Sequence, residues 1–367
     1  MVQAEVIDRW RKAPRLNGFA AFFEQTARGE ANQPDLEQPD ADTGLFNNDL
    51  DCLTFGDTHR RLWGAFDSHY FASIPFRLEE EWRLGAAILR HNLKIWAQTG
   101  RPATLYSLGA GAGTLARTLA RLGDGRLATL CCSPTDGNRI SFSAQRGSPY
   151  AFFHHGPFFE LDDARYAVDP NLAAFTDGFD VLFEDTTFQM YGGDRVNQTA
   201  FVAPRIRERG LFVQVQKLRH PDPETYWMRE RQKDVEFKAR FFSQAQIAEK
   251  RREVLNTMDN FQVELEASVA ALAQFFRYTM VTWNSGNFYT IVSSNSADTL
   301  CGFVNGMIQP AIPDAYCYET LPLGFDRGER FTITDSWRWR EADAIVPGEA
   351  AYAARQQSTS PGATITL

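Results

Sequence analysis

Residues 104–117 read Thr-Leu-Tyr-Ser-Leu-Gly-Ala-Gly-Ala-Gly-Thr-Leu-Ala-Arg, and this stretch decides the fold. Its first five residues form a short apolar run that is typical of a buried strand. Glycines follow at positions 109, 111 and 113, and Leu115, Leu119 and Leu122 then recur at helical spacing. The pattern predicts a strand, a tight turn and a helix whose first N–H groups are free to bind a ligand.

The spacing of the three glycines separates two kinds of nucleotide-binding turn. The turn reads Gly-x-Gly-x-Gly, and Thr114 stands where the dinucleotide pattern Gly-x-Gly-x-x-Gly requires its last glycine. The turn resembles the first motif of class I S-adenosylmethionine-dependent methyltransferases. That resemblance implies S-adenosyl-L-methionine as the cofactor, with its methionine part against the turn, where a Cβ would collide with it. A tight turn that binds no ligand is the alternative.

The segments after the turn alternate between strands and helices, which predicts a mostly parallel sheet covered on both faces. We expect strands at residues 126–132, 150–154, 179–183 and 211–218. Two further β-rich runs, 276–283 and 287–293, are joined by the hairpin signal Asn284-Ser285-Gly286. A parallel sheet closed by an antiparallel hairpin resembles the seven-stranded methyltransferase sheet. We therefore expect a Rossmann-like α/β fold.

Three segments lie outside this alternating pattern. Residues 1–100 are expected to form a helical N-terminal cap, with the clearest helix at 76–99. The methyltransferase-like domain then spans 101–295, with a helical insertion at 221–275. Residues 296–367 form a C-terminal extension, which is predicted to be loosely ordered after about residue 341 because that part is rich in small and polar residues.

Composition limits the class of protein and its partners. The chain has 367 residues, 44% of them hydrophobic, so it can build a large core. Its net charge of −8 argues against nucleic-acid binding, which depends on clustered Lys and Arg. No run of about 18 apolar residues or secretory signal is present, so no membrane association is expected. The five cysteines have no metal-binding spacing and indicate reduced thiols, hence a cytoplasmic protein without a bound metal.

Ligands of open α/β sheets bind beyond the carboxyl ends of the strands, and this rule selects the cofactor candidates. The turn contributes Ser107, Gly109, Ala110, Gly111 and Gly113, the next strand ends contribute Ser133, Pro157 and Phe158, and the cap contributes Tyr70. The chain departs from the resembled family at Ser107, Ser133 and Pro157-Phe158, where acids are usual. The resemblance then implies one hydrogen bond from Ser133 to the ribose and an adenine held by stacking. For Tyr70, plain packing is the alternative.

Glu184 and Asp185 follow the fourth strand and are the clearest catalytic candidates. A carboxylate at this edge can take a proton from a substrate nucleophile, and Glu184 is also a candidate for binding the cofactor. His154 is the third catalytic candidate, because the pKa of histidine lies near neutrality. We assign His155 and Tyr191 to the substrate pocket. The alternatives are an exposed acidic loop and hydrogen-bonded structural histidines.

These features together predict a methyltransferase that acts on a small molecule through oxygen, nitrogen or carbon. The alternatives are a nucleic-acid or protein methyltransferase, a nicotinamide-dependent oxidoreductase, and a cofactor-binding protein without turnover. The missing acids favour the last of these, whereas Thr114 and the closing hairpin disfavour the oxidoreductase. Charges of both signs, among them Lys233, Lys238 and Lys250, mark the insertion as a solvated surface, a lid over the acceptor or a homodimer contact.

Overall fold

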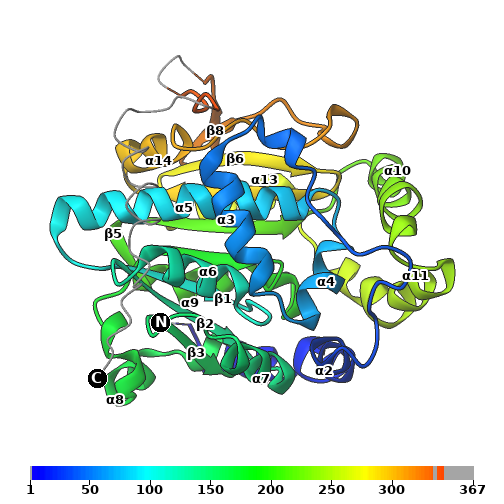
Figure 1. The fold of residues 1–367 in the computed structure, drawn as a ribbon, viewed down its shortest axis with the longest axis horizontal. Helices are drawn as coiled ribbons and strands as arrows, with labels where there is room; N and C mark the ends of the chain where they lie inside the picture. The colour runs from blue at the N-terminus through cyan, green and yellow to red at the C-terminus, as the bar shows by residue number, and fades with distance from the viewer. Residues whose placement is uncertain (1, 334–336, 343–367) are drawn as a thin grey trace, which may run out of the picture.

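A nine-stranded sheet forms the centre of the computed structural model, which describes residues 2–333 and 337–342 (Figure 1). The strand order is β3-β2-β1-β4-β5-β7-β6-β8-β9. Five parallel strands come first: β1 (Ala103–Leu108), β2 (Leu127–Ser133), β3 (Ala151–His155), β4 (Phe179–Asp185) and β5 (Ile206–Lys217). β6 (Tyr278–Ser285) and β7 (Phe288–Ser294) form the closing hairpin, and β7 pairs antiparallel with β5.

The expected α/β fold is confirmed, because the first seven strands have the order and directions of the class I methyltransferase sheet. Two strands that we did not expect, β8 (Leu323–Asp326) and β9 (Glu329–Phe331), extend the sheet beyond β6. They are short and joined by the turn Arg327-Gly328, where both residues have positive φ. Strands of three and four residues give too few alternating positions to show in a sequence pattern.

Helices cover both faces of the sheet. On one face, α3 (Leu50–Arg61), α5 (Arg77–Thr99), α6 (Thr114–Gly123) and α14 (Ala297–Val304) bury alternate strand residues such as Leu105 and Val213. On the other, α1 (Ala4–Arg11), α8 (Asp163–Val168), α9 (Arg195–Val202) and α13 (Leu265–Leu272) bury their neighbours Tyr106 and Phe212. Because successive residues point to opposite faces, strands buried on both sides are apolar throughout.

The residues before β1 are helical, as expected. α2 (Ala20–Arg28) and α4 (Ala65–Phe71) lie at one end of the sheet, beside the insertion helix α11 (Gln244–Lys250) (Figure 1). The long helix α5 runs across the sheet and ends at Gly100, whose φ of 71° stops the helix in the left-handed conformation. The segments flanking the sheet at this end therefore come from both the cap and the insertion.

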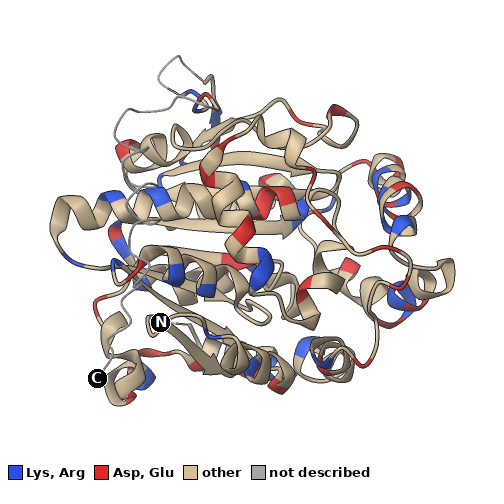
Figure 2. Ribbon diagram, viewed as in Figure 1, with Lys and Arg blue, Asp and Glu red and all other residues tan. Residues whose placement is uncertain are grey.

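The insertion between β5 and β6 is helical. It consists of α10 (Pro223–Gln232), α11, α12 (Asn256–Met258) and α13, with π-helical turns at Lys233–Phe237 and Arg251–Leu255. Charged side chains of both signs occur in the insertion around α10 and α11 (Figure 2). Their prediction as a solvated surface is wrong for Glu230, Lys233 and Lys238, which are buried. These residues face the sheet and the cap rather than water, which charge pattern alone does not reveal.

The cysteines, the helix lengths and the arrangement of possible metal ligands bear on the expectations from composition. All five cysteines are free. Across the described ranges, no helix combines the length and apolar character needed to cross a membrane, and no group of His, Cys, Asp and Glu is arranged to hold a metal. The part predicted to be loosely ordered, after about residue 341, lies outside the described residues apart from residue 342.

Candidate functional site

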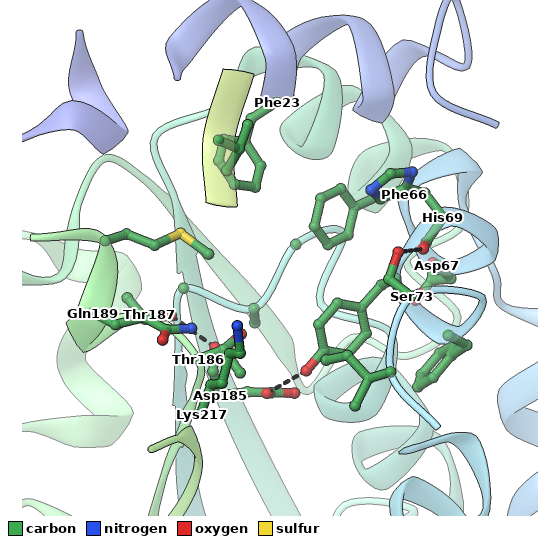
Figure 3. Close-up of a pocket in the computed structure, with 18 of the residues that line it drawn as sticks. Phe23, Phe66, Asp67, His69, Ser73, Asp185, Thr186, Thr187, Gln189 and Lys217 are labelled. Atoms are coloured by element: carbon green, nitrogen blue, oxygen red, sulfur yellow. Dashed lines mark hydrogen bonds between the residues drawn. The ribbon is translucent and has the colours of Figure 1, made fainter. Parts of the chain in front are cut away.

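A deep pocket lies at the carboxyl edge of the parallel strands and encloses about 1290 Å³, including the open space at its mouth. Its walls come from the ends of β1, β2, β4 and β5, from α2 and α4, and from the insertion. In Figure 3, Phe23 and Phe66 stand on one side of this space, with Asp185 and Lys217 opposite. The pocket occupies the edge at which open α/β sheets bind ligands.

The glycine turn forms part of the wall through Gly109, Ala110 and Gly111, whereas Gly113 does not reach the pocket. The three glycines have φ values of 64°, 56° and 69°, a region that L-residues rarely adopt. Protein atoms occupy the positions next to their missing Cβ atoms. A Cβ on Gly109 would lie 1.8 Å from Thr187 Oγ1, and one on Gly111 would lie 2.7 Å from Phe66 Cδ1.

This packing corrects the expectation that a ligand fills the space of the missing Cβ atoms. The glycines allow the turn to pack tightly against the loop after β4, against α4 and, through Gly113, against Cys131 of β2, whose Sγ would lie 2.5 Å from a Cβ there. The turn reaches the pocket through its other side. Its tight packing therefore fixes the position of the wall that a ligand would contact.

Asp185 connects the loop after β4 to the N-terminal cap. Its Oδ1 accepts a hydrogen bond from the hydroxyl of Tyr70 (Figure 3), and its Oδ2 lies 2.7 Å from Arg77 Nη2. Arg77, which is fully buried, also binds Glu81 at 2.6 Å. Burial raises the pKa of Asp185, although Arg77 opposes the shift, and burial likewise raises the pKa of Tyr70 well above its usual value. The structure thus brings two predicted site residues, Tyr70 and Asp185, together at the pocket.

Glu184 faces away from the pocket, so the predicted catalytic pair and the predicted cofactor contact of Glu184 are wrong. Its Oε1 accepts hydrogen bonds from the backbone N–H groups of Thr187 and Phe188 at 2.6 and 2.9 Å. The amides of Gln214 and Gln216 each donate to Oε2 at 3.3 Å. Burial raises the pKa of Glu184 to about 7. Neighbouring strand residues point to opposite faces, so only one of the two acids can face the pocket.

The two histidines also lie outside the pocket, which contradicts the catalytic assignment of His154 and the substrate assignment of His155. His154 is buried, with Nε2 at 3.5 Å from Glu160 Oε2, and burial lowers its pKa. His155 is exposed at the end of β3. β3 is an edge strand of the sheet, and no residue of the loop that directly follows β3 lines the pocket.

Helix α1 covers the place where we expected the adenine. The ring of Trp10 packs 5.3 Å from that of Phe158, and Tyr191 lies 5.4 Å from Phe158 on another side. Phe158 is 1% exposed, and neither it nor Pro157 lines the pocket. Ser133 also misses the pocket, because its Oγ accepts hydrogen bonds from Asn138 Nδ2 and the backbone N–H of Thr135. The next residue of that loop, Pro134, does line it.

Four polar atoms of residues in the pocket wall have no hydrogen-bond partner among the described residues, and two of these are Asn138 Oδ1 and Lys238 Nζ. The other two are the hydroxyl of Ser107, at the end of β1, and Oε1 of Gln189, in the loop after β4. Both side chains are buried, with exposed fractions of 1% and 4%. Because unpaired buried polar groups are costly, a ligand that supplies their partners would be favoured here. Tyr191, predicted for the substrate, also lines the pocket.

The pocket has two further walls, which sequence reasoning missed. Phe22 and Phe23 of α2 pack with Val254 and Leu255 of the insertion, and all four line the pocket. Beyond them stand Lys217, Lys233, Lys238 and Lys250, which we call the lysine cluster. The apolar face of α2 was visible in the sequence, but nothing there indicated that it packs against residues more than 200 positions later.

Similarity to known proteins was found through structure alone. No protein-family model matches the sequence, and no curated protein matches it. The structure is similar to that of the plantazolicin methyltransferase BpumL in complex with SAH, with a TM-score of 0.40, 7% identity, and coverage of 80% of this chain and 100% of that one. For an O-methyltransferase family protein from Burkholderia thailandensis, the TM-score is 0.38 with 14% identity, and 79% and 71% of the two chains are covered.

A third similar structure is the magnesium protoporphyrin IX methyltransferase ChlM from Synechocystis PCC 6803 with bound SAH. Its TM-score is 0.36 with 11% identity, and 66% of this chain and 94% of that one are covered. The chain spans only 57% of the length of another similar structure, a putative O-methyltransferase from Nostoc punctiforme PCC 73102. Because identities and TM-scores are this low, we take the fold from the strand order and the function from the site itself.

Proposed function

We propose that the protein is an S-adenosylmethionine-dependent methyltransferase whose acceptor is a small molecule. The observation that carries this proposal is the methyltransferase strand order combined with a glycine turn that lines a deep pocket at the carboxyl edge of the sheet. Polar groups at the strand ends and apolar side chains of the cap and the insertion line this pocket, a mixture that suits a small ligand.

The residues around the turn fit the methionine end of the donor. An amino acid carries a carboxylate, to which the Ser107 hydroxyl can donate, and an ammonium group, from which Gln189 Oε1 can accept. Both of these buried atoms lack a partner among the described residues. Pro134 and Asn138 continue the pocket wall toward the end of β2, the side on which the resembled family holds the ribose. When bound, the donor supplies an activated methyl group.

The chain's own contribution would be alignment and the exclusion of water. Methyl transfer requires little beyond an aligned acceptor and a dry site. Phe23, Phe66 and Met190 supply apolar walls around the space. Tyr70 and Asp185 are the polar pair facing it, and Tyr70 stays protonated because burial raises its pKa. Each oxygen of Asp185 accepts one hydrogen bond, from Tyr70 or from Arg77, and keeps a further lone-pair site that could take a proton from an acceptor.

Thermal unfolding with added ligands tests the proposal. S-adenosylhomocysteine should raise the melting temperature and NAD should not, because a ligand that binds the native state at 100 times its Kd stabilises it by about 2.7 kcal/mol. Ser107→Ala should weaken this effect without lowering stability, since the hydroxyl has no partner to lose. Ser143→Ala, at an exposed position, is the control. Stabilisation by NAD alone would contradict the proposal.

Two observations favour a second candidate, a methyltransferase-like protein that binds its cofactor without turnover. Trp10 covers Phe158, and no acid stands at the end of β2. In this case S-adenosylhomocysteine would bind but no acceptor would be methylated. Incubation with isotopically labelled S-adenosylmethionine and a panel of acceptors separates the two functions.

The proposal also covers the division of the chain into domains, its location in the cell and its assembly. We keep the division into a cap (1–100), a methyltransferase-like domain (101–295) and an extension (296–367), supported by the start of β1 at Ala103. The free cysteines support a cytoplasmic location. Exposed apolar side chains on and after α10, Trp227, Met228 and Val235, support a homodimer contact through the insertion.

A further inference from the structure

The lysine cluster lines the same pocket as the glycine turn and Asp185. Lys217 ends β5, Lys233 and Lys238 follow α10, and Lys250 ends α11. Lys217, Lys233 and Lys238 have exposed fractions of 2–5%, and Lys250 is partly buried. Four lysines that line one pocket at this depth are unusual, because lysines are rarely buried unless they are paired.

The ion pairs around the lysine cluster do not neutralise all of its positive charge. Glu230 binds Lys217 and Lys233 at 2.9 and 2.5 Å, and Asp234 lies 2.9 Å from both Lys238 and Arg251. Asp259 is the third carboxylate, at 3.2 Å from Lys217. The four lysines and Arg251 are thus five cationic groups that face three carboxylates. If all were ionised, the region would hold two positive charges in excess.

Two lysines have ammonium groups that are poorly satisfied. Lys238 Nζ lies near Asp234, but it has no partner in hydrogen-bonding geometry among the described residues. Lys250 Nζ contacts His69 Nε2 at 2.6 Å and Ser73 Oγ at 2.7 Å, and no carboxylate of the described residues lies within 4 Å of it. Burial lowers the pKa of Lys238 and Lys250, and that of Lys233 to about 7. An added anion would restore the balance.

The pocket between the turn and the lysine cluster is apolar. Phe22, Phe23 and Phe66 line it from the cap, and Leu255 and Met258 line it from the insertion. A ligand that reaches the lysines must therefore place an apolar body against these side chains. Its charged end would be desolvated there, which makes a fixed opposite charge worth more than in water.

We propose that the methyl acceptor is an apolar acid, whose aromatic or aliphatic body fills the Phe-lined space and whose carboxylate or phosphate binds Lys238 and Lys250. This inference rests on the proposed function and adds the chemical class of the acceptor. The lysines act as binding residues for the anionic group. The acceptor's body then extends toward Asp185 and the glycine turn, which line the same pocket.

The test compares three probes of one shape: 4-bromobenzoate, 4-bromophenyl phosphate and the neutral 4-bromobenzamide. Their affinities for the full-length protein are measured by calorimetry. We expect at least one of the anions to bind about tenfold more tightly than the amide, because a charged hydrogen bond is worth more than a neutral one. The tighter of the two anions identifies the head group. Equal affinities of all three probes would overturn the inference.

Lysine variants locate the anion. Lys238→Met and Lys250→Met should each reduce the affinity for the preferred anion about tenfold, and neither should change the affinity for the amide. Both variants should fold, because an apolar side chain of similar length removes the cost of burying an amine, although Lys238 gives up its ion pair with Asp234 and Lys250 its contacts with His69 and Ser73. Lys94→Met, at an exposed position, is the matched control. If both variants bind the anion as the wild type does, the lysine cluster is not its site.

Titration with S-adenosylhomocysteine separates this inference from the proposed function. Its affinity should be unchanged in both lysine variants, because we place the donor at the glycine turn. A similar loss for S-adenosylhomocysteine would mean that the lysines bind the donor's own carboxylate, which overturns the inference and leaves the function standing. Anion binding without any S-adenosylhomocysteine binding would overturn the proposed function instead. Bromine anomalous scattering from a crystal soaked with the preferred anion provides an independent position.

Discussion

At the scale of single residues, Asp185 joins the cap to the sheet. Its two oxygens accept from Tyr70 of α4 and Arg77 of α5, while its backbone belongs to β4. Arg77 offsets part of the cost of burying this carboxylate, and Glu81 binds Arg77 in turn. Two successive helices of the cap and a strand more than 100 residues later are thus fixed around one side of the pocket.

Replacing Asp185 by Asn should reduce the free energy of unfolding by about 1–3 kcal/mol, because Arg77 loses a charged partner while the amide oxygen can still accept one hydrogen bond. The affinity for S-adenosylhomocysteine should stay within about twofold of the wild-type value, and turnover should slow. Urea unfolding and calorimetry check the first two effects. Asp57→Asn, an exposed position on α3, is the control. Unchanged turnover would remove Asp185 from the mechanism.

Glu184 predicts a pH dependence of stability. Burial raises the pKa of Glu184 from 4.5 to about 7, so between these values the folded state binds more protons than the unfolded state. The contribution is present in full below pH 4.5 and is lost as the pH rises through 7. Wild-type stability should therefore fall by up to about 3 kcal/mol across this window relative to Glu184→Gln, which cannot titrate.

Urea unfolding of both proteins at pH 5 and pH 7 measures this difference. Glu184→Gln should fold, because its amide can donate to Gln214 Oε1, which has no partner among the described residues. A stability difference that is the same at both pH values would show that Glu184 keeps an ordinary pKa in the folded protein.

At the scale of elements, the sequence motif predicted the conformation of the glycine turn but not the side chains that pack against it. The spacing predicted a tight strand-to-helix turn, and the positive φ values at all three glycines agree. Which side chains pack against it could not be predicted, because Thr187 and Phe66 come from segments about 80 residues after and 40 residues before it. Tertiary packing, rather than local pattern, decides which side of the turn is open.

Gly109→Ala should destabilise the protein by about 1–3 kcal/mol, because an alanine at a φ of 64° is strained and its Cβ would collide with Thr187. Gly18→Ala, which has no atom within 4 Å of the new Cβ and no positive φ, should change stability by less than about 0.5 kcal/mol. Thermal unfolding of both variants checks the comparison. Equal effects of the two substitutions would contradict the tight packing of the turn.

Helices and strands with long periodic patterns were predictable, and the short strands β8 and β9 were not. The helix expected at 76–99 is Arg77–Thr99 in the structure, since its apolar positions recur over six turns and Gly100 ends it. Helix α1 covers Phe158 through the side chain of Trp10. The sequence around an isolated aromatic residue does not indicate which residue it packs against. The predicted adenine site failed for this reason.

At the scale of the whole molecule, three parts of the chain meet at one pocket. The sheet supplies the glycine turn and Asp185, the cap supplies Tyr70 and the Phe side chains of α2, and the insertion supplies three of the four lysines. α2, α4 and α11 lie together at this end of the sheet (Figure 1). Composition and periodicity predicted each part separately. Their convergence required the tertiary structure, because Lys217 of β5 pairs with Glu230 of α10, and Lys250 of α11 contacts His69 of α4.

A crystal structure of the protein with S-adenosylhomocysteine tests the central claim most directly. We predict that the homocysteine part lies in the pocket beside Gly109, Ala110 and Gly111, with the Ser107 hydroxyl in hydrogen-bonding distance and the sulfur facing the space lined by Phe23 and Tyr70. The donor found at another edge of the sheet, with the turn closed by Phe66 and Thr187 alone, would contradict the account.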